Sequence, residues 1–374
     1  MSNTLTNYLP KWLATALPIL RKNCVMPRLV NNDFSMQPMA KGSQVDIPIP
    51  PTLSVSDVTP GVTPAASSDI SPTTVALSLS SWKYVKFGLT DKELTQINSG
   101  ESFVPKALDA SMKALAEKVN SDIFSAYTKV YGYVGTAGTT PFASTVAAAT
   151  DARKVLTNQL APTTDRYLVL DPSAEANALN LSAFAAVQNS GDGNVVKEGL
   201  LGRKYGFDTY CDQQVPTHTT GAAAGYLVNN GAGYAAGIST LAIDTGTGAW
   251  VDGDIITFAG HSQTYVVDGT STTTSLVLKN ALVAAVADNE VITKKASHVV
   301  NLAFNKDAFA FAARPLSGVI DGFGSLIASF VMQDPSGIPV RIQVIREWMQ
   351  TSIVLDILYG FQCIRPELAC RIAG

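Results

Sequence analysis

Residues 105–131, PKALDASMKALAEKVNSDIFSAYTKVY, decide the fold. The apolar residues of this stretch recur every three or four positions, at Leu108, Met112, Leu115, Val119, Ile123, Tyr127 and Val130. This spacing predicts one amphipathic helix, which Pro105 begins and Gly132 ends. At 1.5 Å per residue the helix is roughly 40 Å long. A two-faced helix of that length needs a sheet or another element along it, as in an α+β protein.

The composition is unusually poor in charge. Charged residues make up 15% of the chain, below the quarter that is typical of globular proteins, and the net charge is −3. No run of Lys and Arg offers a basic surface to nucleic acid. We expect no signal peptide and no membrane anchor, hence synthesis in the cytosol, because no basic, long apolar segment opens the chain. A sparsely charged surface suits a protein that packs against neighbours.

The N-terminal quarter reads as an arm followed by an extended loop. Residues 1–41 place apolar anchors such as Trp12 and Leu17 between prolines, a pattern too short for a self-sufficient helix. Residues 42–90 alternate apolar and polar side chains on both sides of a Pro-rich tip, which predicts a long β-hairpin. The tip, residues 52–72, is long enough that a function such as reaching a neighbour is expected.

The remaining chain predicts mixed α and β segments interrupted by a β-rich insertion. Residues 217–298 contain short β-like runs between Gly, Asp, Ser and Thr turns, which predicts a small antiparallel barrel or sandwich. The other predicted elements are a capping box at Thr90–Glu93, helices over 144–159 and 173–184 (the latter capped by Asp171), strands over 166–170 and 340–347, an edge strand over 206–216, a helix over 306–314, and strands over 352–359, 362–365 and 369–372.

No constellation of residues indicates catalysis. Ser80-Ser-Trp-Lys83 matches the S-x-x-K pattern of acyl-serine enzymes, but it lies on a predicted strand and lacks the accompanying motifs. Asp252 and Asp254 are interpreted as a solvated turn, because a calcium site needs more oxygen ligands. The chain's histidines lack metal-binding spacing and are interpreted as surface or turn residues: His218, His261 and His298. We therefore predict no enzyme, no cofactor and no metal.

Four stretches, taken with the order of the parts, resemble the major capsid (coat) proteins of tailed bacteriophages. The family has the Hong Kong 97 fold, and the closest resemblance is to podophage coat proteins with an inserted immunoglobulin-like or telokin-like domain. The stretches are Gly202–Asp208 leading to Val215-Pro216, Gly253–Gly260, Asn301–Ala310 with Arg314–Leu316 (similar to the family's helix after the insertion), and Leu355–Gly360 with Arg365–Leu368.

The resemblance implies a division of the whole chain. Its parts would be an N-terminal arm (1–41), an extended loop (42–90), a spine helix and peripheral domain (91–143), an axial domain (144–216), an inserted β domain (217–298), and a second axial part with a return to the peripheral domain (299–374). Within the last part, 316–364 would belong to the axial domain.

The resemblance also implies the function. The protein would assemble as pentamers and hexamers into an icosahedral head that encloses double-stranded DNA without sequence-specific binding, in a virion built in the host cytoplasm. Its partners would be other copies of itself, a separate scaffolding protein, a portal and a decoration protein, and no membrane. Contacts between subunits are expected from the arm, the extended loop and the spine, at Trp12, Leu17, Pro60, Pro64, Asp69, Lys83, Lys86 and Glu101.

Two alternatives stay open at this point. An encapsulin-like compartment shares the fold but encloses cargo enzymes, and the insertion favours a phage coat over it. A hydrolase or carbohydrate-binding protein with a β-rich module would need a cleft of converging acidic or histidine side chains, which the sequence does not indicate.

Overall fold

The computed structural model of the chain describes residues 25–32, 44–49, 55, 57, 70, 73–96, 100–186, 198–314, 316, 326–333 and 339–374. The described helices are α2 (Met26–Leu29), α3 (Asp91–Gln96), α4 (Gly100–Ser125), α5 (Ala147–Asn158), α6 (Pro172–Asn180) and α7 (Ser182–Ala185). Short 3₁₀ turns are η3 (Ala126–Lys129), η4 (Lys306–Ala308) and η5 (Pro366–Leu368). With the sheets below, they make the α+β architecture expected from the sequence.

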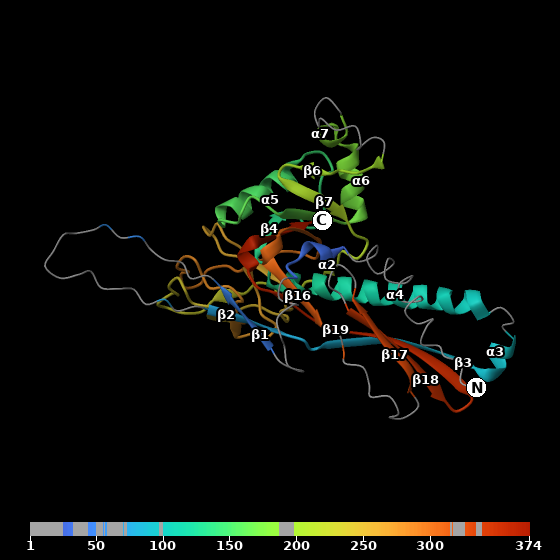
Figure 1. The fold of residues 1–374 in the computed structure, drawn as a ribbon. Helices are drawn as coiled ribbons and strands as arrows, with labels where there is room; N and C mark the ends of the chain where they lie inside the picture. Colours follow the sequence, from blue (N-terminus) through green and yellow to red (C-terminus); the bar gives the residue numbers. More distant parts are fainter. Residues whose placement is uncertain are drawn as a thin grey trace.

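An antiparallel five-stranded sheet lies along α4. Its strands are β3 (Ser81–Thr90), β16 (Phe309–Arg314), β17 (Leu326–Gln333), β18 (Pro339–Glu347) and β19 (Gln350–Cys363). The long strand β19 is central, because it pairs with β3 along one edge and with β18 and then β16 along the other. Figure 1 shows α4 running beside β17, β18, β19 and β3 in one elongated lobe.

The apolar stripe predicted for the long helix is buried against this sheet. Leu108, Met112 and Leu115 belong to the main hydrophobic core, together with Leu355 and Ile357 of β19. The hydroxyl of Tyr359 in β19 donates to the carboxylate of Asp122 in α4, which adds a polar tie between helix and sheet. The helix therefore forms where the sequence predicts, because its apolar face has a partner of matching length.

A second sheet, seven-stranded and mixed, builds the other lobe. Its strands are β4 (Gly132–Gly135), β5 (Arg166–Leu170), β6 (Arg203–Lys204), β7 (Phe207–Cys211), β8 (Thr217–His218), β15 (His298–Asn305) and β20 (Ala369–Ala373). The path runs β4-β20-β15-β5-β7-β6, and β8 pairs with β15. In Figure 1, α5, α6 and α7 gather with this sheet. As predicted, Asp171 caps α6 by accepting from the Ser173 amide at 3.0 Å.

The predicted β-hairpin is present at its base. Strands β1 (Gln44–Ile49) and β2 (Thr73–Ser78) pair antiparallel, with Ile49 opposite Thr73. Their inward side chains share a small core with β16 and the residues after β19: Val45, Ile47, Leu77, Ala310, Ala312 and Ile364. The hairpin is thus anchored on its own chain. Most of the predicted tip, residues 52–72, lies outside the described residues.

The β-rich insertion has its own hydrophobic core. Its strands are β9 (Leu227–Val228), β10 (Thr240–Asp244), β11 (Ile255–Thr257), β12 (Tyr265–Val266), β13 (Ser275–Val277) and β14 (Thr293–Lys294), in two three-stranded sheets. The side chains buried between them include Tyr226, Leu241, Trp250, Ile256 and Tyr265, a cluster separate from the main core. We call residues 219–297 the inserted unit. The chain enters it from β8 and leaves it into β15, and these strands pair with each other.

The helix predicted over residues 306–314, within the stretch resembling a helix after the insertion, is wrong. Residues 306–308 make the turn η4, and 309–314 form strand β16. Phe309 and Phe311 enter the main core, whereas Ala310 and Ala312 enter the small core under the hairpin. Burial on both faces and pairing with β19 override the helix propensity of this alanine-rich run.

Other expectations also need correction. The strand after Gly206 is not at an edge, because β7 lies between β5 and the two-residue strand β6. The described strands within 316–364 belong to the sheet along α4 and not to the sheet of β5 and β7. The long helix begins at Gly100, before Pro105, and its last part tightens into η3. The helix predicted over 173–184 breaks at Leu181, which has extended backbone angles.

Replacing Leu355 by Ala tests the packing of α4 on β19. Leu355 is fully buried in the main core, so the loss of transfer free energy and the cavity left behind should lower the free energy of unfolding by about 2–5 kcal/mol. Urea unfolding followed by circular dichroism measures this. Trp348→Ala is the control, because the exposed Trp348 side chain should change stability by no more than about 0.5 kcal/mol. Equal effects of both substitutions would contradict the packing.

Candidate assembly surface

The face of the five-stranded sheet that points away from α4 carries large exposed side chains. Cross-strand partners share a face, so Trp82, Tyr84 and Lys86 of β3 lie beside Leu358, Asp356 and Val354 of β19. We call these residues, together with Arg341 of β18, the outer sheet face. The side chains of Trp82 and Tyr84 remain 59% and 67% exposed. Aromatic groups left in water on a rigid strand are typical of contact surfaces.

A buried ion pair holds this face in place. Arg341 donates to both carboxylate oxygens of Asp356, over 2.9 and 2.5 Å, and both side chains are buried. The indole N–H of Trp82 donates to the same carboxylate at 3.0 Å. A two-pronged Arg–carboxylate pair is geometrically specific. The ion pair, through its carboxylate, therefore fixes the orientation of the Trp82 ring. The exposed surface of the ring is held in one position.

The turn between β18 and β19 exposes a second apolar group. Trp348 and Met349 form this turn, and their side chains are 89% and 65% exposed. Met349 adopts a positive φ of 53°, an unusual backbone conformation for a residue other than glycine. The backbone amide of Asp91 in α3 donates to the Met349 carbonyl at 3.1 Å. The turn is thus tied to α3 while its side chains face outward.

Charged pairs brace the same end of the sheet. Arg346 donates to both carboxylate oxygens of Asp91, over 2.7 and 2.5 Å, and this hydrogen bonding lowers the pKa of Asp91 below 3.8. Lys86 pairs with Glu347 and lowers the pKa of that carboxyl. The predicted capping box is present, since the carboxylate of Glu93 accepts from the Thr90 amide at 2.8 Å. These charged pairs therefore hold the β18–β19 turn, with its exposed apolar side chains, in a fixed position.

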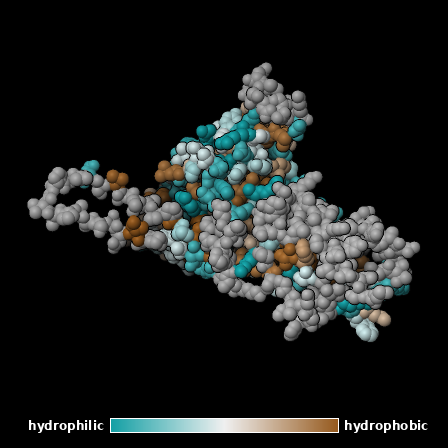
Figure 2. All heavy atoms as spheres, viewed as in Figure 1, coloured by the Kyte–Doolittle hydropathy of each residue, from teal (hydrophilic) through white to brown (hydrophobic). Residues whose placement is uncertain are grey.

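Strand β3 also has an available edge. Within the described part of the chain, β3 pairs with β19 along one side and with no strand along the other. An unpaired edge presents a row of backbone donors and acceptors that can bind another chain. Figure 2 shows hydrophobic and hydrophilic residues intermixed over the described surface, with apolar groups reaching solvent at several places.

The residues predicted from the sequence to make contacts fall in different places. Lys83 and Lys86 lie on β3, where Lys86 already pairs with Glu347 of its own chain. Glu101 belongs to the first turn of α4, and its side chain is outside the description. The other predicted contact residues lie outside the described residues: Trp12, Leu17, Pro60, Pro64 and Asp69.

The exposed aromatic residues were missed, although the sequence held a signal for them. The alternation along Ser81–Thr90 puts Trp82, Tyr84 and Lys86 on one face. The pair Trp348-Met349 interrupts two predicted strands where a polar turn is usual. An apolar pair at such a position indicates a contact outside the chain.

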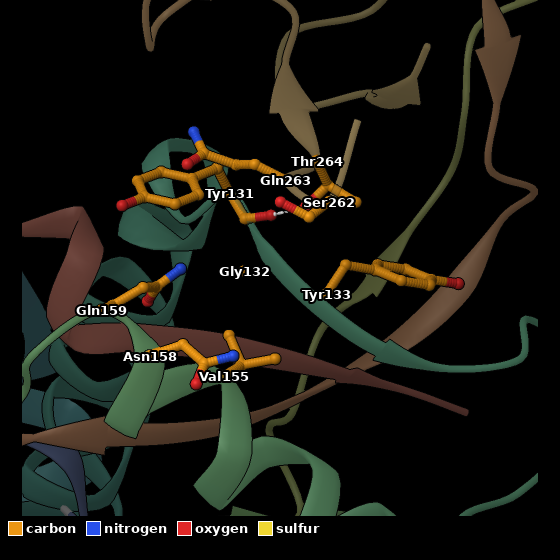
Figure 3. Close-up of a pocket in the computed structure, with 9 residues that line it drawn as sticks. All are labelled: Tyr131, Gly132, Tyr133, Val155, Asn158, Gln159, Ser262, Gln263 and Thr264. Atoms are coloured by element: carbon orange, nitrogen blue, oxygen red, sulfur yellow. Dashed lines mark hydrogen bonds between the residues drawn. The ribbon is translucent and has the colours of Figure 1, made fainter. Parts of the chain in front are cut away.

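A cleft lies between the inserted unit and the core. The cleft has a volume of about 220 Å³ and is lined by Tyr131, Gly132, Tyr133, Val155, Asn158, Gln159, Ser262, Gln263 and Thr264, none of them charged. In Figure 3 residues of α5 line one side and residues 262–264 line the other, where Thr264 donates to the Tyr131 carbonyl. In the described ranges no group of three or more His, Cys, Asp or Glu side chains could hold a metal ion. No described helix is long and apolar enough to cross a membrane.

Comparisons with known proteins identify a family from the sequence and a fold from the structure. A family model described as "Phage capsid protein" matches residues 74–294. A solved chain of Mycobacterium phage Che8 is similar at 15% identity and a TM-score of 0.52, over 93% of this chain and 90% of that one. The capsid structure of cyanophage P-SCSP1u is similar at 14% identity and a TM-score of 0.53, over 94% and 88%. No curated protein matches. The expected Hong Kong 97-like capsid fold is confirmed.

Replacing Asp356 by Ala tests the support of the outer sheet face. The substitution removes the carboxylate from the buried Arg341 and the acceptor from the Trp82 indole, so the free energy of unfolding should fall by about 3–5 kcal/mol. Urea unfolding measures the loss.

The double variant Arg341→Met/Asp356→Leu is the matched control. It replaces the pair by apolar side chains and should recover most of the stability, because the buried charge is gone. A double variant as unstable as Asp356→Ala would show that the ion pair is not what fixes this face.

Proposed function

This chain belongs to the phage capsid protein family, and we propose that, as the major capsid protein of a tailed phage, it assembles as pentamers and hexamers into an icosahedral head around double-stranded DNA. Membership of this family makes it a structural protein of the virion. The family match favours a phage shell over an encapsulin-like compartment. The uncharged cleft of Figure 3 gives no support to a hydrolase.

One observation carries the proposal. The chain holds large apolar side chains exposed on rigid supports, at Trp82 and Tyr84 of the outer sheet face and at Trp348 and Met349 of the β18–β19 turn. Burying one such side chain contributes about 1.5–3 kcal/mol. Contacts of this size are weak singly, but every copy in a closed shell makes them with several neighbours. The groups exposed in one chain thus become the interfaces of the assembly.

The β1–β2 hairpin is the proposed occupant of the outer sheet face of an adjacent copy. Its base is anchored to its own chain by Val45, Ile47 and Leu77. Beyond the paired strands, Val55 and Ile70 are exposed, so the hairpin carries apolar groups that its own chain does not cover. Pro60, Pro64 and Asp69 stay proposed contact residues of this junction, as do Trp12 and Leu17 for the N-terminal arm. Lys83, whose register partner Ile357 faces α4, and Glu101 of α4 stay proposed subunit contacts on the other side of the sheet.

Charge supports an enclosing role. The net charge of −3 and the low content of charged residues mean that the shell would not hold DNA tightly through its phosphates, a binding mode that depends on many Lys and Arg contacts. We propose that the DNA is enclosed without sequence-specific binding. We further propose that the protein has no catalytic activity, assembles in the host cytoplasm on a scaffolding protein, and meets a portal and a decoration protein in the virion.

Shortening the β1–β2 hairpin tests the proposal. Ile49 and Thr73 are register partners, so an Asn-Gly turn in place of residues 50–72 should keep β1 and β2 paired. We expect a variant with unchanged circular dichroism that sediments as single copies, whereas the intact chain forms capsomers or shells. Sedimentation velocity and negative-stain microscopy measure this.

A complementary variant locates the receiving surface. Tyr84→Ser/Trp348→Ser should also remain folded and unassembled, while Val283→Ser/Val291→Ser, at exposed positions of the inserted unit, should assemble normally. Mixing the hairpin-shortened variant with the Tyr84/Trp348 variant should leave only weak association, since each retains half of the junction. Normal assembly of the hairpin-shortened chain would overturn the proposed junction.

A further inference from the structure

Two histidines face each other where the inserted unit joins the core. The chain leaves the core on β8 and returns on β15, and the register of these strands places His218 directly opposite His298. Both side chains are only 2% exposed, and their ring centres are 5.5 Å apart. The interpretation of these residues as surface or turn histidines is therefore wrong. Long-range pairing of the two connecting strands buries them.

His218 links the inserted unit to the end of the long helix. Its Nε2 lies 3.0 Å from Oδ1 of Asp254 in the inserted unit, and its Nδ1 lies 3.1 Å from the hydroxyl of Tyr127 in η3. A carboxylate only accepts, so Nε2 carries a proton and donates to Asp254. Both ring nitrogens of His218 therefore have a partner.

Asp254 is fully buried and not solvated as its turn position suggested. Burial acts to raise its pKa, but hydrogen bonds from His218 and from the amides of Val251 and Gly221 together lower the pKa below 3.8. The carboxylate therefore stays ionised at neutral pH. Because it accepts from both His218 and its own loop, it fastens the inserted unit to the strand that enters it.

His298 has one nitrogen satisfied and one without a partner. Its Nδ1 lies 2.8 Å from the Ala296 carbonyl and must donate to it, whereas its Nε2 is buried without a hydrogen-bond partner in the described structure. Tyr133 packs edge-on at 5.2 Å, with Lys295 over its outer face. A proton added to Nε2 would create a buried cation that nothing described accepts from.

The surroundings of His298 carry a positive charge already. The guanidinium of Arg371 in β20 is fully buried, donates to the Gly253 carbonyl of the inserted unit at 2.9 Å, and lies 4.9 Å from the centre of the Tyr127 ring. Burial, and secondarily Arg371 and His218, lower the pKa of His298 to about 4 despite the Ala296 hydrogen bond and Asp254. The titratable or charged groups around His298 are Arg371, His218, Asp254, Tyr127, Tyr133 and Lys295.

Further hydrogen bonds cross the junction. Thr264 donates to the Tyr131 carbonyl, and Lys279 donates to the Thr128 carbonyl at 3.2 Å. The uncharged cleft of Figure 3 lies beside these contacts. The hydrophobic clusters of the inserted unit and of the core are separate. The unit can therefore leave its docked position without opening either core.

We infer that His298, buried opposite His218 where the two connecting strands pair, makes the docking of the inserted unit on the core acid-sensitive, so that the unit is released as the pH falls below neutrality. Both hydrophobic cores stay folded during this release. The inference concerns the single chain and does not depend on shell assembly.

The direction of this pH dependence follows from proton linkage. In the released state His298 meets water and its pKa returns to 6.5, against about 4 when docked. The released state thus binds more protons between these values, and the docking constant falls by about tenfold for each pH unit in that window. Between pH 7 and pH 5 the expected loss of docking is about 20-fold. Above about pH 7.5 docking is insensitive to this group.

Hydrogen exchange of the full chain, followed by mass spectrometry, tests the inference. The labelling times at pH 7 and pH 5 are adjusted so that the intrinsic chemical exchange of the amides is equal at both pH values. We expect peptides covering 216–221 and 295–299 to lose about 20-fold in protection at pH 5, while peptides from β10 and β19 keep theirs. His298→Asn retains a donor for the Ala296 carbonyl but does not titrate, so it should abolish most of this pH dependence.

His261→Asn is the matched control, because His261 belongs to the same inserted unit but bonds to Tyr265 and Ala285 away from the connecting strands. It should behave like the unmodified chain. His298→Gln, which also offers an amide donor and does not titrate, serves as a second non-titrating variant if His298→Asn does not fold. Three results would each overturn the inference: equal protection of the connecting strands at both pH values, full pH dependence in the non-titrating variants, or loss of protection across β10 and β19 together.

Discussion

The packing of α4 against β19 is the constraint on which the rest of the structure depends. The helix supplies a buried stripe, and β19 supplies a strand long enough to cover it while pairing with β3, β16 and β18. Each of those strand pairings positions a different part of the surface. Through β3 the sheet presents Trp82 and Tyr84, through β18 it presents the Trp348 turn, and through β16 it anchors the β1–β2 hairpin. A single helix–sheet interface thus orients the outer sheet face, the Trp348 turn and the base of the hairpin.

The two polar clusters of the molecule serve different purposes. The Arg341–Asp356 pair is a salt bridge with both partners present, and it makes an exposed aromatic face rigid. Within the described residues, the cluster of His218, His298 and Arg371 leaves buried nitrogen atoms of His298 and Arg371 without partners, at the point where two separately packed parts meet. Fully satisfied networks rigidify, whereas partly satisfied ones are costly in a medium of low dielectric constant. One cluster therefore suits a permanent surface and the other a junction that can open.

Local signals in the sequence predicted local structure well. The stripe of α4, strand β5, the Thr90–Glu93 capping box and the Asp171 cap each depend on neighbours within a few residues, and all are present. The phage capsid family followed from the order of motifs and is confirmed.

What failed depends on partners far along the chain. The alanine-rich β16 is a strand because β19 pairs with it, and the histidines are buried because β8 meets β15. To predict that Trp82 and Trp348 are exposed, one would have had to follow which side chains share a face across two paired strands. No spacing rule within one segment reports such pairings.

The central claim is that the exposed apolar groups of one copy are covered by the hairpin of the next in a closed shell. A cryo-electron microscopy reconstruction of the particles formed by the intact chain tests it most directly. The account predicts icosahedral shells in which residues 50–72 of each copy lie on the outer sheet face of its neighbour and cover Trp82 and Tyr84. Shells in which that hairpin folds back on its own copy, or a chain that stays a monomer at every concentration even with its scaffolding protein, would contradict it.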